Sequence, residues 1–326
     1  MPERHHVFLT RPLDEAVLDE FRPQLPAPLH IHHDAEFPPS RVELLNAVRG
    51  ARGLVTMVTD RIDAEVLDAA GESLTVVANM AVGYDNIDVT AAAERGITVT
   101  NTPGVLDESV ADLTLALLLS TVRRVAEGDR FIRTGKEWIW GPQSFVGLDI
   151  SAGSTLGIVG LGRIGLATAR RAAAFGMRIL ATGRRAHSAE GQALGVEPAT
   201  LDELIAASDV VSLHAPLTAE TTHLIGKDQL AAMKPGSYLL NTARGPLVDE
   251  EALADSLEAG HLAGAGLDVH EEEPAINERL RSLENVVLLP HIGSAGGATR
   301  NRMASLAFKN LVAVLNGQDP LTPVQA

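Results

Sequence analysis

The 326-residue chain contains no cysteine. This absence excludes disulfides, a thiolate nucleophile and cysteine-ligated zinc. Aromatic residues are scarce, at 3% of the chain, and no apolar run approaches the length of about 18 residues that a membrane-spanning helix needs. The first residues, Met-Pro-Glu-Arg-His-His, lack the apolar core of a signal peptide. We therefore expect a cytoplasmic protein.

Positive charge is also in short supply. The formal net charge is -15, and the acidic residues are spread along the chain instead of being gathered in a tail. This distribution argues against nucleic acid and against an anionic membrane surface as partners. An acidic protein that binds an anionic small molecule needs a local cationic site, so individual arginines become candidates for such a site.

Apolar residues make up 45% of the chain, and its length suits two domains. Two stretches alternate strand-like with helix-like segments. The first stretch has expected strands near residues 7–9, 53–57, 74–78 and 97–100. The second has expected strands near residues 155–159, 178–182, 209–213, 237–241, 263–268 and 286–289. Six strands in βα order predict a doubly wound parallel sheet.

The segments outside these two stretches differ in character. Residues 101–104, Asn-Thr-Pro-Gly, are typical of a turn or hinge, and an apolar helix is expected from Asp107 to about Val125. The segment 126–151 carries both tryptophans among glycine, proline and charged residues, which is typical of an excursion that packs on another surface. A last helix is expected near residues 298–316.

A glycine-rich turn opens the second stretch. Gly160, Gly162 and Gly165 stand at G-x-G-x-x-G spacing between an expected strand and an expected helix. In dinucleotide-binding folds these glycines allow a tight turn, let the backbone approach a pyrophosphate and let the helix pack closely on the strand. The helix N-terminus, here Arg163 and Ile164, then faces the phosphates. The turn therefore predicts a dinucleotide site.

The turn lies in the middle of the chain, so another domain is begun before it. We expect an α/β protein in which a dinucleotide-binding domain, residues 102–289, is inserted into a substrate-binding domain, residues 1–101 plus 290–326. The inserted domain is expected to be Rossmann-type, and the smaller one a flavodoxin-like β/α unit.

The end of the second expected strand bears on which dinucleotide is bound. An NAD site usually has an acidic residue about 20 residues after the glycines, whereas an NADP site has arginine there. This chain has Thr182 and Gly183 at that place, followed by Arg184 and Arg185. Two guanidinium groups can grip a 2′-phosphate. The residues favour NADP(H), with NAD(H) possible, and the alternative is an ordinary solvated turn.

Ligands of open parallel sheets bind beyond the carboxyl ends of the strands. The residues at those ends in the second stretch are therefore the candidates: His214-Ala215-Pro216, Asn241-Thr242-Ala243-Arg244-Gly245, Asp268 to Glu273, and Pro290-His291 to Ser294. One arginine, several acids and one histidine are thus expected to converge on one rim.

These groups suit hydride transfer to a carbonyl. Arg244 can pair with a carboxylate and a neighbouring carbonyl oxygen. His291 can supply the proton, and Glu273 can stabilise the imidazolium and fix the ring. Taken singly, each has an ordinary alternative: a loop ion pair, an exposed glutamate or a strand-end cap.

Several ordered motifs carry a wider resemblance: residues 82–88 (VGYDNID), 100–105 (TNTPGV), 111–113 (ADL), the glycine turn, 215–218 (APLT), 241–245 (NTARG), 267–269 (LDV) with Glu273-Pro274, and 290–295 (PHIGSA). Together they span the chain from about residue 53 to 323. The sequence resembles the D-isomer-specific 2-hydroxyacid dehydrogenase family, and within it the glyoxylate/hydroxypyruvate reductases.

The resemblance implies a catalytic set of Arg244, Glu273 and His291. Glu273 is selected over its two glutamate neighbours because it precedes proline, five residues after the aspartate of the Leu-Asp-Val motif. It also implies that main-chain amides of Val82 and Gly83 bind the substrate carboxylate.

Further roles follow from the same resemblance. Met57 and Met80 would line the substrate pocket, and the cofactor would meet Asp268, the Thr242-Ala243 backbone and Ser294. A homodimer would form through the cofactor domain and segment 126–151, with Trp138 or Trp140 reaching a neighbouring active site.

We therefore expect an NADP(H)-preferring reductase that converts glyoxylate or hydroxypyruvate into glycolate or a D-2-hydroxy acid, with closure of the two domains excluding water. One alternative is an NAD-dependent D-2-hydroxyacid or phosphoglycerate-type dehydrogenase. Another, of a different class, is a nucleotide-sensing binding protein similar to transcriptional co-repressors.

The remaining histidines are expected to have structural roles. His270 stands where the family commonly has an aromatic residue, so we interpret it as a packing or surface variant. His30, His32 and His33 lack an accompanying ligand pattern, so we expect exposed side chains and no metal site.

Overall fold

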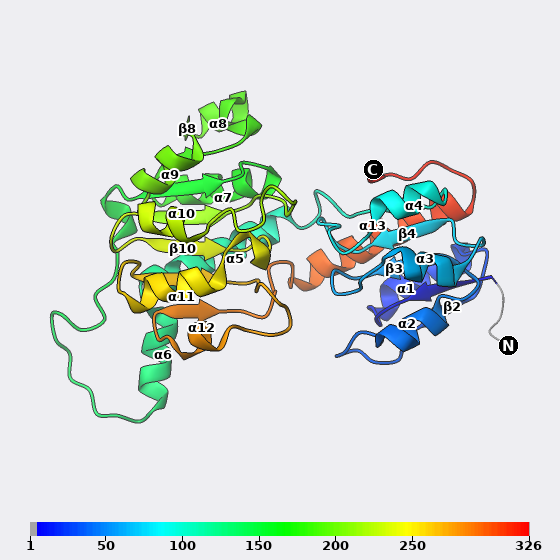
Figure 1. Ribbon diagram of the computed structural model, residues 1–326, viewed down its shortest axis with the longest axis horizontal. Coiled ribbons are helices and arrows are strands. Elements are labelled where there is room, and N and C mark those ends of the chain that lie inside the picture. The colour runs from blue at the N-terminus through cyan, green and yellow to red at the C-terminus, as the bar shows by residue number, and fades with distance from the viewer. Residues whose placement is uncertain (1–4, 326) are drawn as a thin grey trace. The chain divides into compact units, whose positions relative to one another are not determined.

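The computed structural model describes residues 5–325, which form two compact α/β units (Figure 1). Residues 1–4, which belong to the N-terminal stretch considered above, and residue 326 lie outside the described residues. Unit 1 is built from the chain up to Leu106 and from Gly296 onward, and unit 2 from Asp107 to Ala295. Each is described by itself below.

The unit boundaries fall a few residues after those expected, 101/102 and 289/290. The first shift arises because residues 101–102 stay bound to unit 1: the Asn101 side chain donates to the Val82 carbonyl, and the Thr102 N–H donates to the Ala81 carbonyl. The second arises because the N–H groups of Ile292 and Gly293 donate to a carboxylate of unit 2.

Unit 1 holds a five-stranded parallel sheet in the order β2-β1-β3-β4-β5. The strands are β1 His6–Leu9, β2 Leu29–Ile31, β3 Ala51–Thr56, β4 Val76–Asn79 and β5 Thr98–Thr100. The helices are α1 Glu15–Phe21, a 3-10 turn Arg22–Gln24, α2 Arg41–Ala47, α3 Ala64–Ala70, α4 Val89–Glu94 and α13 Gly297–Leu315. Sequence patterning missed β2, since this three-residue edge strand is not fully buried and carries no apolar run.

Helix α13 returns to unit 1 after the whole of unit 2 and packs on β3 and β4. Gly53 in β3 makes this approach possible, because a Cβ there would lie 2.7 Å from Leu311 Cδ1. The ring of Phe308 stacks on Phe21 of α1 at 5.4 Å between centroids. The last helix is thus part of the core of the first unit.

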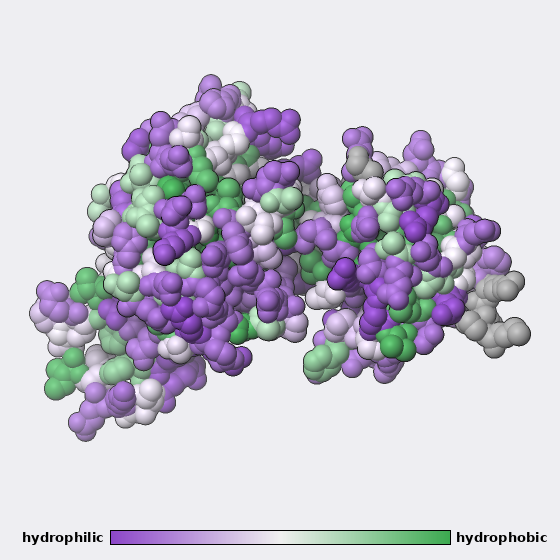
Figure 2. Space-filling view, in the orientation of Figure 1, coloured by the Kyte–Doolittle hydropathy of each residue, from purple (hydrophilic) through white to green (hydrophobic). Residues whose placement is uncertain are grey.

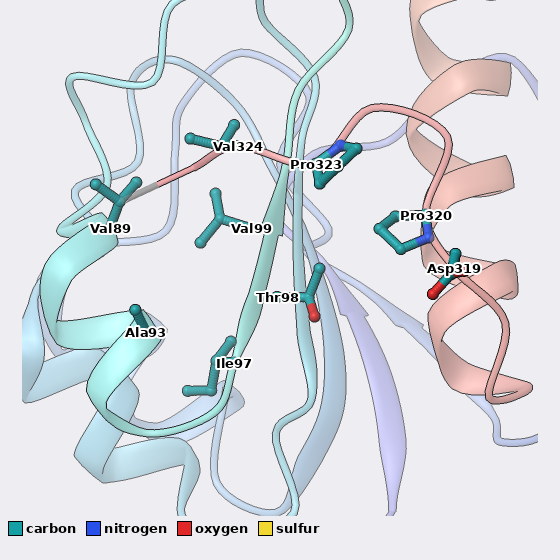
Figure 3. A pocket seen from close by; sticks show the side chains of 9 residues that line it. All are labelled: Val89, Ala93, Ile97, Thr98, Val99, Asp319, Pro320, Pro323 and Val324. Atoms are coloured by element: carbon teal, nitrogen blue, oxygen red, sulfur yellow. The ribbon is translucent and has the colours of Figure 1, made fainter.

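The chain's last described residues cover the open edge of β5. The Val324 N–H donates to Val99 O at 2.8 Å, and Thr100 bridges to Pro323 in antiparallel fashion. A largely apolar pocket of about 390 Å³ lies between this tail, β5 and α4 (Figure 3). An edge strand exposes unpaired N–H and C=O groups, and the tail pairs some of them.

Unit 2 holds a seven-stranded parallel sheet in the order β12-β11-β10-β9-β6-β7-β8. The strands are β6 Thr155–Val159, β7 Arg178–Ala181, β8 Val196–Pro198, β9 Val210–Leu213, β10 Tyr238–Asn241, β11 Gly264–Leu267 and β12 Val286–Leu288. The predicted doubly wound sheet is confirmed with one strand more, since the short β8 was missed. Strand order reverses at β6, which pairs with both β7 and β9.

The helices of unit 2 are α5 Asp107–Val122, α6 Val125–Arg133, α7 Arg163–Ala174, α8 Ala189–Ala193, α9 Leu201–Ala207, α10 Lys227–Ala232, α11 Glu250–Glu258 and α12 Glu278–Ser282. Short 3-10 turns in this unit cover Ile150–Ala152, Arg184–His187 and Gly245–Leu247. No helix within residues 5–325 is long and apolar enough to cross a membrane.

The long apolar helix ends earlier than expected, at Val122. The chain that returns at residues 147–148 packs on the C-terminal end of the helix. The Leu148 N–H donates to Val122 O, and a Cβ on Gly147 would lie 2.0 Å from that oxygen. Arg124, with φ 54°, then redirects the chain into α6. The first part of the predicted excursion is therefore helical, and the irregular part begins after Arg133.

Candidate active site

The glycine turn lies at the point where strand order reverses in the seven-stranded sheet. Gly160 has φ 93°, and a Cβ there would lie 2.8 Å from Ala215 N. A Cβ on Gly165 would lie 2.6 Å from Gly160 O, so both positions are closed to larger residues. Gly162 has open space around it and stands at the N-cap of α7.

The N-terminus of α7 fits an anionic group. Gly162 provides no side-chain cap, and Arg163 and Ile164 form the first turn of this 12-residue helix. The first N–H groups of a helix lack intrahelical acceptors and carry partial positive charge. Open space at Gly162 beside these donors is the cradle that a pyrophosphate needs, so the residues present fit a dinucleotide.

Thr182 at the end of β7 holds the glycine turn in place. Its hydroxyl accepts from Gly160 N at 2.9 Å, and its carbonyl accepts from Leu161 N at 2.9 Å. The chain then enters a 3-10 turn that exposes Arg184 and Arg185. Arg185 lies 3.7 Å from Glu190, whereas the Arg184 side chain makes no hydrogen bond or ion pair within residues 5–325.

His214 follows β9, directly before Ala215 and Pro216. Its Nε2 lies 2.9 Å from Ser212 Oγ, while its Nδ1 is buried without a partner among the described residues. Burial lowers the pKa of His214 to about 4, so the ring is neutral at physiological pH.

Thr242 and Ala243 follow β10 on the same rim. The Thr242 hydroxyl is buried and lies 2.9 Å from the hydroxyl of Thr114 in α5. The Ala243 N–H donates to Asn241 Oδ1 at 3.0 Å. These bonds fix the main chain of the segment that leads to Arg244.

Asp268 follows β11 and is buried. Its two carboxylate oxygens accept from Ile292 N and Gly293 N, both at 2.8 Å. Burial raises the pKa of Asp268 above its ordinary value, although these two N–H groups oppose the shift. The resemblance assigns Asp268 to the nicotinamide; in this structure its carboxylate anchors the loop that holds His291 and the half-buried Ser294.

Glu273 and His291 form a direct pair at this rim. Glu273 Oε2 lies 2.9 Å from His291 Nδ1, and each side chain is 30% exposed. Burial acts to raise the pKa of Glu273, but the hydrogen bond and charge of His291 outweigh it, so the pKa lies below its ordinary value. His291 has φ 55°, an uncommon conformation for a non-glycine residue that indicates local backbone strain.

Arg244 precedes a 3-10 turn in a segment that packs tightly on the Glu273 loop. A Cβ on the next residue, Gly245, would lie 1.9 Å from His270 O. The Arg244 guanidinium donates to Ala243 O at 2.9 Å, and its side chain is half-buried. Unit 2 therefore brings the Arg244 segment against the loop that carries Glu273.

The other predicted substrate residues belong to unit 1, where they follow β3 and β4. Met80 is buried, Met57 is half-buried, and the Met57 N–H donates to Asp60 Oδ2 at 2.7 Å. The loop at Val82 and Gly83 is held by its carbonyls, which accept from Asn101 Nδ2 and Asn79 Nδ2. Within residues 5–325 the Val82 and Gly83 N–H groups donate to no backbone carbonyl.

Sequence reasoning missed Asp60, which orders the Met57 loop. This carboxyl is buried, accepts from Met57 N and the Thr10 hydroxyl, and has one oxygen without a partner among the described residues. Burial raises its pKa above the ordinary value. The available signal was an acidic residue in the short loop after a buried strand, four residues past the end of β3.

The expectation for the three early histidines was wrong in one case. His30 and His33 are exposed, but His32 is buried, because it follows β2, which the sequence did not reveal. No cluster of three or more potential metal-ligating side chains is found within residues 5–325.

A doubly wound sheet with a fitted dinucleotide cradle and an Arg-bearing rim beside a Glu–His pair defines a nicotinamide-dependent oxidoreductase. A family model described as "D-isomer specific 2-hydroxyacid dehydrogenase, NAD binding domain" matches residues 115–293. The chain belongs to the D-isomer-specific 2-hydroxyacid dehydrogenase family, and it is an NAD(P)-dependent dehydrogenase. The predicted family and fold class are thereby confirmed.

Relatives and solved structures cover nearly the whole chain. A glyoxylate reductase of Korarchaeum cryptofilum is 49% identical over 96% of this chain and 94% of its own length. A solved protein from Thermus thermophilus has a TM-score of 0.90, with 50% identity over 98% of this chain and 100% of that one. An NADPH-dependent glyoxylate/hydroxypyruvate reductase from Sinorhizobium meliloti, solved with NADP and malonate, has a TM-score of 0.84 and 37% identity, covering 99% and 97%.

Proposed function

We propose that this enzyme reduces small 2-oxo acids, with glyoxylate and hydroxypyruvate as leading substrates, to glycolate or D-2-hydroxy acids, with NADPH preferred over NADH. The observation that carries the proposal is the 2.9 Å pair of Glu273 Oε2 and His291 Nδ1 at the rim that also holds the dinucleotide cradle. The curated relatives named glyoxylate reductase support the substrate class.

The pair determines where the proton is given. A carboxylate only accepts hydrogen bonds, so His291 Nδ1 carries the hydrogen that it donates to Glu273 Oε2. The other ring nitrogen, Nε2, is then the atom that gains and gives a proton. The lowered pKa of Glu273 keeps this carboxyl ionised near neutral pH, where its charge stabilises the imidazolium.

Substrate binding is proposed for Arg244 together with the Val82 and Gly83 N–H groups. A planar guanidinium can grip the carboxylate bidentately and polarise the adjacent carbonyl oxygen. The bound nicotinamide would supply the hydride to the 2-oxo carbon. His291 Nε2 gives its proton to the carbonyl oxygen, which becomes the hydroxyl, and the neutral ring regains a proton from water.

A panel of initial rates tests the proposal. Glyoxylate, hydroxypyruvate, pyruvate and 2-ketogluconate are each measured with NADPH and with NADH, and the configuration of each chiral product is determined. We expect the largest kcat/KM for glyoxylate or hydroxypyruvate with NADPH, and D-configured products. Turnover of none of these acids with either cofactor would contradict the assignment.

The NADPH preference rests on the turn after β7. Arg184 and Arg185 are exposed there, and no acidic side chain occupies positions 182 and 183 to repel a phosphate. Arg184→Ala with Arg185→Ala should raise the KM for NADPH about tenfold or more and leave the KM for NADH nearly unchanged. Arg178→Ala, which removes an exposed arginine paired with Glu197 elsewhere in unit 2, is the matched control. An equal effect on both cofactors would contradict the preference.

We also propose a homodimer through segment 126–151 and the cofactor domain. The segment exposes Trp138, Ile139 and Trp140, with 92% of Ile139 accessible. Figure 2 shows apolar groups on this excursion beside α6. Exposed apolar clusters of this kind mark interaction surfaces. Trp138→Ser with Ile139→Ser should shift the mass measured by light scattering from dimer to monomer. The cytoplasmic location stays a prediction.

A further inference from the structure

A second histidine lies directly behind the Glu273–His291 pair. His270 is buried, with a side-chain exposure of 4%. It occupies the loop between Asp268 and Glu273, three residues before the latter. The sequence suggested a packing or surface variant at this position, and the burial excludes the surface reading.

His270 is hydrogen-bonded to both segments that carry the pair. Its main-chain N–H donates to Glu273 Oε1 at 3.0 Å. Its ring Nε2 lies 3.0 Å from Leu289 O, two residues before His291. A carbonyl only accepts, so Nε2 carries the hydrogen and donates it. His270 thus binds the Glu273 carboxylate through its main chain and, through its ring, the main chain two residues before His291.

Apart from the bond to His270, the main chain from Leu289 to His291 makes few hydrogen bonds. Leu289 N donates to Leu267 O at 2.8 Å, His291 N donates to Asp268 O at 2.8 Å, and the residue between them is a proline without an N–H. Within residues 5–325 no other hydrogen bond to Leu289 O is found. The hydrogen bond from the His270 ring is therefore the third one that attaches the main chain of residues 289–291 to unit 2.

A buried carboxyl lies on the other side of the ring, where His270 Nδ1 has no hydrogen-bond partner among the described residues. Glu250 Oε1 lies 3.9 Å from His270 Nδ1, and the Glu250 side chain is 6% exposed. Glu250 and Glu271 clasp each other's main chain, through Glu271 N to Glu250 Oε1 at 3.0 Å and Glu250 N to Glu271 Oε2 at 3.2 Å. Glu271 also lies 2.6 Å from His223 Nε2. Burial raises the pKa of Glu250, the opposite direction to that of Glu273.

We propose that His270 is a positioning residue for the catalytic pair: its ring, hydrogen-bonded to Leu289 O, and its main-chain N–H, bonded to Glu273, set the separation of His291 from Glu273. The proposal rests on the proposed function, because it takes these two residues as the proton-supplying pair. Loss of the ring hydrogen bond would let residues 289–291 move without removing any group that touches substrate or cofactor. Displacements of about 1 Å can cost up to 10²-fold in rate.

Two substitutions separate this role from simple packing. His270→Phe keeps the ring volume and the main-chain N–H to Glu273 but loses the donor to Leu289 O. His270→Gln offers an amide N–H2 at about the place of Nε2. We expect kcat to fall about tenfold in His270→Phe, with KM values for substrate and NADPH within twofold of the original, and to return to within about threefold in His270→Gln.

The matched control is His261→Phe. His261 lies in the same unit and makes the same kind of bond, from Nε2 to Met233 O at 3.0 Å, but it precedes β11 at the opposite end of the sheet. Its kcat should be unchanged. An unchanged kcat in His270→Phe, an equal fall in the control, or no recovery in His270→Gln would each overturn the proposal.

A measurement without turnover guards against misfolding of a variant and against failure of the proposed function. Long-range 1H–15N spectra of the ¹⁵N-histidine-labelled enzyme should show a proton on His270 Nε2, the donor to Leu289 O. In His270→Gln the His291 Nδ1 proton signal should persist, and in His270→Phe it should broaden. Protonation of His270 at Nδ1 alone would overturn the inference, whereas full activity of His291→Asn would overturn the proposed function and not the bond to Leu289.

Discussion

The carboxyl edges of the two parallel sheets differ in where their polar groups come from. In unit 2 the edge carries polar side chains: the guanidinium of Arg244, the acid–base groups of Glu273 and His291 and, behind them, His270. In unit 1 the corresponding edge offers main-chain N–H groups at Val82 and Gly83 and apolar methionines. Its buried acid, Asp60, bonds its own loop.

This difference follows from the chemistry that each edge is proposed to perform. Proton transfer requires a group that titrates, and only a side chain provides one. Binding a carboxylate requires only correctly aimed N–H donors, which the backbone supplies without charge. Substitutions of the Glu273–His291 pair in unit 2 should therefore act on kcat, and substitutions in unit 1 that loosen the loop at Val82 and Gly83 should act on the KM for the 2-oxo acid.

The largest expected effect belongs to His291. His291→Asn should lower kcat by about 10²–10⁴-fold and leave the Kd for NADPH nearly unchanged, because the proton donor is lost while the cradle at α7 is untouched. Asparagine tolerates the positive φ of 55° better than alanine does, so it limits backbone effects. Stopped-flow single-turnover rates and fluorescence titration check the two parts. A near-normal rate would remove His291 from the mechanism.

His214 makes the stability of unit 2 sensitive to acid. The folded protein keeps the ring neutral, with a pKa of about 4, whereas the unfolded chain binds the proton near pH 6.5. The contribution of His214 to the free energy of unfolding is thus fully present above pH 6.5. It falls by roughly 3 kcal/mol as the pH drops towards 4. Urea unfolding of His214→Gln should lack that part of the pH dependence. Parallel curves for the two proteins would contradict the assignment.

Asp60 in unit 1 changes the stability with pH in the opposite direction. Its pKa is raised by burial, so its contribution is present below the unfolded value of 3.8 and is lost as the pH rises through the folded value. Relative to the original protein, Asp60→Asn should therefore gain stability with rising pH, while His214→Gln should gain it with falling pH. Equal slopes in urea unfolding between pH 4 and 7 would remove the contrast between the two edges.

Loosening the loop at Val82 and Gly83 should change the KM for the substrate. Asn101→Ala removes the donor to Val82 O and loosens the loop whose N–H groups are proposed to bind the substrate carboxylate. We expect the KM for glyoxylate to rise about tenfold with kcat within twofold, since uniform binding is lost. Asn316→Ala, which removes an exposed side chain bonded within α13, is the control. A fall in kcat alone would place unit 1 in the chemical step.

The smallest effect concerns stability alone. Thr322→Val removes the bonds from its hydroxyl to Asn101 O at 2.6 Å and from Asn310 Nδ2 at 2.8 Å. The free energy of unfolding should fall by about 1–2 kcal/mol with kcat unchanged. Chemical denaturation measures this, and Thr322→Ser should restore most of the loss. A large fall in kcat would connect the tail to catalysis.

The same contrast explains what the sequence could predict. Gly160, Arg244 and His291 were identifiable because strand ends of a parallel sheet meet at one edge and because these residue types carry recognisable chemistry. The bond from His270 to Leu289 O was not, because one partner is a carbonyl that every residue possesses. Strands β2 and β8 escaped because three-residue edge strands carry too little apolar pattern. The early end of α5 depends on Gly147, which is 25 residues away in the chain.

The return of α13 to the sheet of unit 1 imposes an order on biosynthesis. A ribosome delivers residues 107–295 before it delivers α13, so unit 2 has all its strands while β3 and β4 still lack the helix that packs on them. Domains generally fold as units during synthesis. The nascent chain therefore completes its cofactor-binding unit first, and the apolar face at Gly53 stays exposed until Leu311 arrives.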